Sequence, residues 1–151
     1  MFFPRSLSRL AVAGLLSLLI LVPNATADEV AATKESTVQV EFLEIVTSDV
    51  DATCAALAAL HGTTFGEPVA ELGGAKVAEL TNGGRISVRG PLHDQETPLW
   101  RPYFLTEDIE GAVKAAEAAG AMIAHPPLEI PGQGTFAIYI LGGNHFGLWQ
   151  N

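Results

Sequence analysis

The chain of 151 residues has one cysteine, Cys54, and only 8 basic residues against 17 acidic ones. A single cysteine cannot form an internal disulfide, so a fold in an oxidising compartment has to be stabilised by packing. Cys54 lies among apolar residues at helical spacing, which favours a buried thiol over a nucleophile. The net charge of −9 disfavours nucleic acid and anionic lipid as partners.

Only one long apolar run occurs, Ala11 to Val22, and Arg5 and Arg9 precede it. The small-residue pattern Ala25-Thr26-Ala27 follows, so residues 1–27 are predicted to be a secretory signal peptide. The run is short for a bilayer span, and a retained N-terminal anchor is the alternative. We therefore expect an exported protein, periplasmic or extracellular, without stable membrane insertion after cleavage. With Arg5 and Arg9 removed, six basic residues face 17 acidic ones, a net charge of −11.

An internal repeat organises the rest of the chain after a polar leader at residues 28–37, which is expected to be flexible. The segments EFLEIVTSDVDATCAALAALHG and WRPYFLTEDIEGAVKAAEAAGA each predict a strand, an acidic turn and a helix. Asp49 and Asp108 occupy matching places in them. Ser48 and Thr106 are expected to cap the helix starts, and Gly62 and Gly120 to follow the helix ends.

Short strand patterns follow each predicted helix. They are PVAEL, AKVAELT and RISVRG in the first half, and AMIAH, TFAIYIL and HFGLWQ in the second. Asn82-Gly83 is a hairpin signal, and the prolines of PPLEIPGQG indicate a loop. The pattern predicts an α+β domain over residues 38–151, made of two βαβββ modules at about 38–90 and 100–151. The modules have to pair with each other, within one chain or between two, so a homodimer remains an alternative.

Two βαβββ modules, an Asp-aliphatic-acid helix start in each, and a final Gly-Asn-x-Phe-x-Leu strand resemble the vicinal oxygen chelate superfamily. Glyoxalase I, extradiol dioxygenases, fosfomycin-resistance enzymes and bleomycin-binding proteins belong to that group. The segments WRPYFLTEDIEGAVKAAEAAG, GTFAIYI and GNHFGLWQ are similar in particular to its glyoxalase-like branch. The resemblance implies cupped mixed sheets with a ligand site on the concave face. It does not imply one reaction.

Alternation along the strands assigns side chains to the two faces of the sheet. The apolar face, expected to meet the helices, carries Leu43, Ile45, Ile86, Val88, Pro102, Phe104, Phe146 and Leu148. The opposite face, which lines the cup in the family, carries Phe42, Glu44, Arg85, Ser87, Arg89, Arg101, Tyr103, His145, Gly147 and Trp149.

The resemblance also locates the positions where metal-dependent members carry their ligands. These positions fall on Phe42, Ser87, Arg101 and Gly147. Because divalent metals need neutral or anionic donors, this set predicts that the family metal centre is absent and that no cofactor is required. The alternative is a displaced divalent-metal site on Glu44 and His145. His93 and His125 fall in expected connecting segments and are predicted to be surface residues.

Two functions of the cup follow from these residues. The first is binding of a small molecule, anionic or neutral, by a predicted set of eight side chains: Phe42, Glu44, Arg85, Ser87, Arg101, Tyr103, His145 and Trp149. The second is an enzyme of the lyase, dioxygenase or hydroxylase type, with His145 as general acid or base and Arg101 holding an anionic substrate. A competing interpretation is that the arginines only pair with Glu44 or with surface acids.

Overall fold

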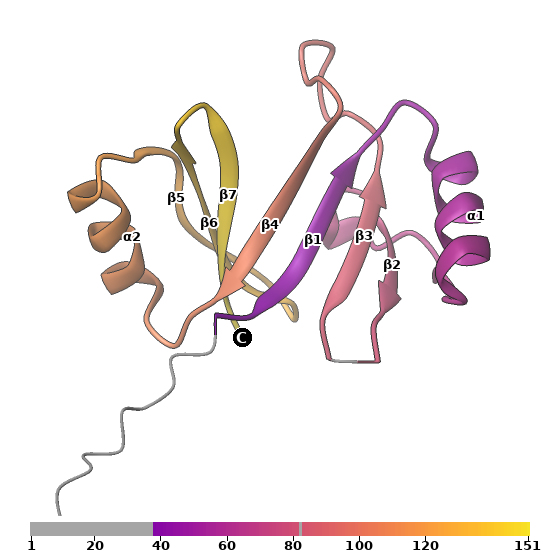
Figure 1. Cartoon of the computed structure of the whole chain (residues 1–151), viewed down its shortest axis with the longest axis horizontal. Helices are drawn as coiled ribbons and strands as arrows, with labels where there is room; N and C mark the ends of the chain where they lie inside the picture. The colour runs from indigo at the N-terminus through magenta and orange to yellow at the C-terminus, as the bar shows by residue number, and fades with distance from the viewer. Residues whose placement is uncertain (1–37, 82) are drawn as a thin grey trace, which may run out of the picture. The chain divides into compact units, whose positions relative to one another are not determined.

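Seven strands form one mixed sheet in the computed structural model, which describes residues 38–81 and 83–151. The strands are β1 (Val40–Val46), β2 (Lys76–Glu79), β3 (Arg85–Arg89), β4 (Leu99–Leu105), β5 (Met122–Ile130), β6 (Gly134–Leu141) and β7 (Asn144–Gln150). The helices are α1 (Val50–His61), α2 (Ile109–Ala118) and the short 3₁₀ helix η1 (Ala70–Leu72). The strand order is β2-β3-β1-β4-β7-β6-β5 (Figure 1). The predicted signal peptide and leader lie outside the described residues.

The two modules of one chain join through antiparallel pairing of β1 with β4. This register places Phe42 opposite Tyr103, and Glu44 opposite Arg101. In each module the first strand also pairs with the last in parallel, β1 with β3 and β4 with β7. The predicted α+β fold class is therefore confirmed, and the modules pair within the chain. None of the helices among the described residues is long and apolar enough to cross a membrane.

Each long helix begins at an aspartate. Asp49 accepts a hydrogen bond from the backbone N–H of Ala52 at 3.0 Å, and Asp108 accepts one from Gly111 at 2.9 Å. The predicted caps, Ser48 and Thr106, were wrong because the helices start one or two residues later. The carboxylates there satisfy free N–H groups and complement the helix dipole.

The helix ends and the first hairpin agree with the prediction. Gly62 ends α1 with a left-handed φ of 65°, and Gly120, with φ 87°, follows α2. The β2–β3 hairpin forms and pairs Glu79 with Arg85. Asn82, part of the hairpin signal, lies outside the described residues.

Two strand predictions were wrong. The PVAEL segment forms η1 and keeps only an isolated bridge between Val69 and Ala75, because Gly73 turns the chain with a φ of 66°. The predicted PPLEIPGQG loop is largely strand, since β5 continues through both prolines to Ile130. Proline is tolerated there because β5 is an edge strand whose pairing with β6 shifts register on both sides of His125.

Apolar clusters on the convex side of the sheet attach the two helices. Cys54 of α1 is buried with Ile45 and Val88, while α2 packs through Val113 on Leu148. Burial raises the pKa of the Cys54 thiol, as expected for an unreactive cysteine. These contacts agree with the face that strand alternation assigned to the helices. The opposite face is left to form the cup.

Candidate ligand-binding site

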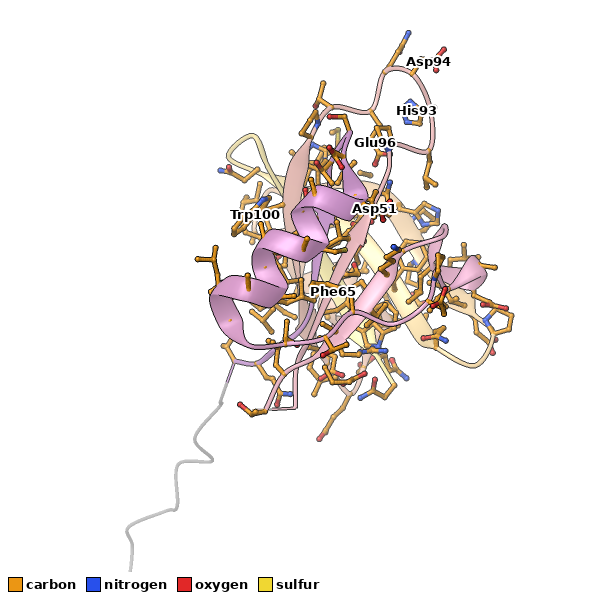
Figure 2. All side chains as sticks on the ribbon, turned by 90° about the vertical axis from the view of Figure 1, so that its right-hand side faces the viewer. Asp51, Phe65, His93, Asp94, Glu96 and Trp100 are labelled. Atoms are coloured by element: carbon orange, nitrogen blue, oxygen red, sulfur yellow. The ribbon has the colours of Figure 1, made fainter. Side chains whose placement is uncertain are left out.

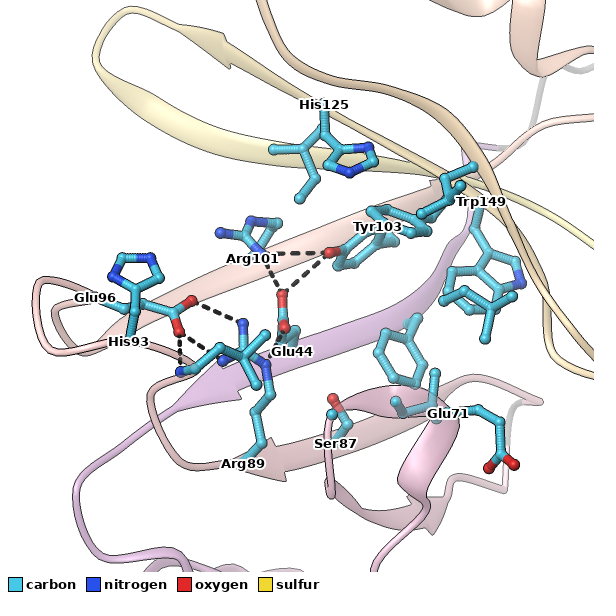
Figure 3. Close-up of a pocket in the computed structure, with 18 residues that line it drawn as sticks. Glu44, Glu71, Ser87, Arg89, His93, Glu96, Arg101, Tyr103, His125 and Trp149 are labelled. Atoms are coloured by element: carbon cyan, nitrogen blue, oxygen red, sulfur yellow. Dashed lines mark hydrogen bonds and ion pairs between the residues drawn. The ribbon is translucent and has the colours of Figure 1, made fainter.

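The concave face of the sheet holds a pocket of about 490 Å³, to which both modules contribute (Figure 3). One wall is apolar and comes from β5 and β6, with Leu128, Ile130, Phe136 and Ile138. The floor is polar and comes from β1, β3 and β4. A volume of this size is in the range of sites for small organic ligands.

Glu44 is the centre of the polar floor. Its Oε1 accepts a hydrogen bond from Arg89 Nε at 2.7 Å, and its Oε2 accepts one from Arg101 Nη1 at 2.5 Å. The Tyr103 hydroxyl donates a third, also to Oε2, at 3.1 Å. Glu44, Arg89 and Arg101 are 7%, 4% and 6% exposed, so these charges are buried and satisfy one another.

A loop between β3 and β4 completes the network at the pocket rim. It carries His93, Asp94 and Glu96 beyond the ends of the two strands (Figure 2). Glu96 turns back and pairs with Arg89 through two bonds, at 2.7 and 2.8 Å, and accepts a third from the backbone N–H of Leu92. A carboxylate bound side by side to a guanidinium in this way is held in both position and orientation.

The hydrogen bonds and the burial of this network change the pKa values of its side chains. Hydrogen bonding to Arg89 lowers the pKa of Glu96 to about 2. Burial alone would lower the pKa of Arg89, but its bonds to Glu96 and Glu44 hold it above the ordinary value. Burial, with the nearby charge of Glu44, raises the pKa of Tyr103. At neutral pH, Glu96 is therefore ionised and Tyr103 remains a hydrogen-bond donor.

Aromatic rings close the end of the pocket opposite this loop. Phe42 stacks on Trp149 with ring centroids 5.2 Å apart, and Tyr103 meets both rings edge-on. Arg85 lies over Phe42 and Trp149, its guanidinium carbon 5.1 and 5.2 Å from the ring centroids. Arg85 therefore supports the aromatic cluster and does not face the pocket.

The positions that carry metal ligands in the family do not fit a metal here. An ideal Cβ on Gly147 would lie closer than 3.0 Å to three atoms of the Tyr103 ring, so any side chain at this position would force the ring to move. Arg101 places a cation where a donor would be needed, and Phe42 offers no donor atom. Within residues 38–81 and 83–151, no three His, Cys, Asp or Glu side chains form a group suited to a metal ion.

The displaced metal site on Glu44 and His145 is not supported by the geometry. Both Glu44 oxygens already accept bonds from arginine. His145 lies on β7 opposite Ile140, and its Nδ1 is buried without a hydrogen-bond partner. A metal on Glu44 would first have to displace a guanidinium group.

Two donors of the pocket floor have no partner among the described residues. They are the Ser87 hydroxyl, on a residue that is 1% exposed, and Arg101 Nε. Arg101 Nη1 is used by Glu44 and, at 3.4 Å, by the Tyr103 oxygen. Arg101 Nε is therefore a buried donor without a partner, and native proteins rarely bury such donors without a reason.

Six of the eight predicted ligand-binding residues line the pocket, and two do not. The six are Phe42, Glu44, Ser87, Arg101, Tyr103 and Trp149. Among the described residues, the pocket wall includes neither Arg85, which lies against the aromatic rings, nor His145. The competing interpretation was that the arginines only pair with Glu44 or with surface acids. It largely holds, since Arg89 pairs with Glu44 and Glu96, and Arg101 pairs with Glu44. Whether a ligand binds stays a prediction.

Several pocket residues were not predicted from the sequence. His125 enters because β5 runs through the expected loop, and His93 and Glu96 come from the β3–β4 loop. Arg89 was placed on the cup face, and the competing interpretation gave it Glu44 as a partner, but its strand-end position gave no sign of Glu96. Only the alternation of β5 on both sides of its prolines could have pointed to His125, Leu128 and Ile130.

The fold defined by these elements is that of the vicinal oxygen chelate superfamily, as the resemblance implied. The hypothetical protein BH1468 from Bacillus halodurans matches with a TM-score of 0.61 and 11% identity, over 76% of this chain and 95% of that one. A variant of methylmalonyl-CoA epimerase from Streptomyces coelicolor, in complex with 2-nitronate-propionyl-CoA, matches with a TM-score of 0.57 and 15% identity, over 77% and 99%. The epimerase from Mycobacterium tuberculosis matches with a TM-score of 0.57 and 14% identity, over 73% and 85%.

No protein-family model and no curated protein sequence matches the chain. At identities of 15% or less, these structures share the fold with this protein and do not specify its reaction.

Proposed function

We propose that the protein is an exported domain of the vicinal oxygen chelate fold that binds a small molecule in the cup without a metal ion. The observation that carries this proposal is the composition of the pocket floor. Arg89 and Arg101 both bind Glu44, Arg101 stands at one of the positions where the family carries metal ligands, and Ser87 Oγ and Arg101 Nε are left without partners. A floor built in this way is preorganised before any ligand arrives.

The apolar wall supports the same function. Leu128 is 50% exposed at the pocket, while Phe136 and Ile138 line it from β6. Apolar surface that stays accessible beside a few fixed polar groups is the usual composition of a small-molecule site.

The enzymatic alternative has less support. It relied on His145 acting with Arg101, but His145 lies outside the pocket wall of the described chain. The Streptomyces coelicolor epimerase variant is in complex with 2-nitronate-propionyl-CoA, a coenzyme A thioester. A coenzyme A ligand would bring several phosphates to a protein of net charge −9, so such thioesters belong in the ligand screen but are not the expected ligands.

A thermal-shift screen of the purified protein, run with and without EDTA, tests the proposal. Binding raises the melting temperature by an amount that grows with the free ligand concentration relative to Kd, and we expect hits whose shifts EDTA does not change. Leu128→Glu should abolish the shift. Met122→Glu is the matched control, since Met122 is a 60% exposed residue of the same strand outside the pocket wall.

Retained shifts in Leu128→Glu would place binding elsewhere. Shifts in melting temperature that disappear in EDTA would show that ligand binding needs a metal ion, which would contradict the proposal.

A further inference from the structure

We infer, resting on the proposed function, that the pocket selects an uncharged ligand with a carbonyl group on an apolar, ring-sized body, and discriminates against the matching carboxylate. Most charges of the floor are already paired, while two of its hydrogen-bond donors are not.

The charges of the floor cancel. Of the described residues that line the pocket, only Arg89 and Arg101 carry a permanent positive charge. Arg89 is bound between Glu44 and Glu96, and Arg101 also binds Glu44. A ligand carboxylate would add a third negative charge to two buried positive ones, close to Glu44 and without an unpaired cation to receive it.

Charges outside the floor act in the same direction. Glu71 lines the pocket as a further acid, and Arg85, the remaining cation of the cup face, is held over Phe42 and Trp149. The net charge of −9 also lowers the local concentration of anions at the protein surface.

The unused groups of the floor match a neutral carbonyl. Arg101 Nε is buried without a partner, and Nη1 of the same guanidinium is already shared between Glu44 and Tyr103. Ser87 offers a second unpaired donor, its hydroxyl, on the neighbouring side of Glu44, as β3 pairs Ser87 with Glu44. A carbonyl oxygen can accept from such donors without bringing a full charge into the site.

His125, across the pocket from Ser87, offers an acceptor for an amide N–H of the ligand. His125 Nδ1 lies 2.7 Å from the carbonyl oxygen of Pro126. Because a carbonyl only accepts, Nδ1 carries the proton, and Nε2 of the neutral ring is left as an acceptor. In Figure 3, His125 lies across the pocket from Ser87, with Arg101 and Glu44 between them.

Affinity for the body of the ligand comes from the apolar wall. The His125 ring lies 4.8 Å from that of Phe136, and Leu128, Ile130 and Ile138 continue this surface. A flat aromatic or alicyclic body would cover this wall while its carbonyl group reaches the floor.

Calorimetric titration of the wild-type protein with matched pairs tests the inference. Suitable pairs are 2-naphthamide with 2-naphthoate and indole-3-carboxamide with indole-3-carboxylate, at pH 7.5 and about 0.15 M salt, where the Debye length is about 8 Å. We expect the amide to bind at least about tenfold more tightly than the acid in each pair, because only the acid adds a buried charge.

Ser87→Ala removes one unpaired donor and should weaken amide binding about threefold to tenfold, with little change for the acid. Glu44→Gln removes one negative charge from the floor. It should therefore reduce the ratio between the Kd of the acid and the Kd of the amide. The comparison on the wild-type protein remains decisive even if Glu44→Gln fails to fold.

Acids that bind as tightly as the amides, or more tightly, would overturn the inference and leave the proposed function standing. If no member of either pair binds, the inference is also overturned. The proposed function falls with it only if the wider thermal-shift screen finds no ligand either.

Discussion

The ring of Tyr103 occupies the space that a side chain at position 147 would need. Gly147 and Tyr103 are paired across β7 and β4, and an ideal Cβ on the glycine would fall within the ring. Tyr103 in turn donates its hydroxyl hydrogen to Glu44. The glycine of the last strand is therefore part of how the polar floor is held in place.

Gly147→Ala should destabilise the protein by about 2 kcal/mol, because the new methyl group forces the Tyr103 ring to move in a packed core. Urea unfolding measures the loss. Gly90→Ala is the matched control, since nothing lies within 4 Å of an added Cβ there, and it should change the free energy of unfolding by less than about 0.5 kcal/mol. Equal effects of the two substitutions would show that the ring is not tightly packed on Gly147.

Glu44→Gln should cost about 3 kcal/mol, because it leaves two buried guanidinium groups with one negative partner fewer. Glu79→Gln, at an exposed residue of β2, should change the stability by less than about 0.5 kcal/mol. Chemical denaturation of both variants at pH 7 makes the comparison. A Glu44→Gln variant as stable as wild type would mean that the arginines do not depend on this carboxylate.

The contribution of Glu96 should depend on pH. Its pKa is lowered from 4.5 to about 2 in the folded protein, so the stabilisation is present above pH 4.5 and is lost as the pH falls towards 2. Because Glu96 is partly accessible to solvent, we expect a contribution of about 2 kcal/mol. Glu96→Gln should therefore be less stable than wild type at pH 6, and the difference should shrink by pH 3. A difference that stays constant over this range would refute the ion pair as its source.

Export should leave a chain that begins near Asp28. Expression of the full sequence in a bacterium, followed by N-terminal sequencing of the extracytoplasmic fraction, makes this test. Ala27→Arg should block cleavage, because the site requires small residues. An exported wild-type chain that still begins at Met1 would favour the retained anchor instead.

Strand alternation predicted the faces of β1, β3, β4 and β7 because neighbouring side chains of a strand point to opposite sides whatever their identity. Six residues of the predicted site, which alternation assigned to the concave face, line the pocket as predicted, among them Ser87 and Trp149. Alternation does not specify the partners of a side chain. Arg85 lies on the expected face, yet it packs on aromatic rings and not in the pocket.

The remaining errors come from local patterns that tertiary pairing overrides. Three prolines in the segment after α2 predicted a loop, but an edge strand tolerates Pro126 and Pro127, and this change brought His125 into the pocket. Glu96 lies in a loop without periodicity, and its bonds to Arg89 and to the backbone N–H of Leu92 determine where its carboxylate lies.

Titration calorimetry of a ligand from the screen, into protein stripped with EDTA and into the same protein supplied with Zn²⁺ or Ni²⁺, tests the central claim most directly. We expect the same Kd in both preparations, and less than about 0.1 metal ion per chain at micromolar free metal, since the floor offers guanidinium groups and a glycine where ligands would be needed. One metal ion per chain, with ligand binding that disappears on stripping, would contradict it.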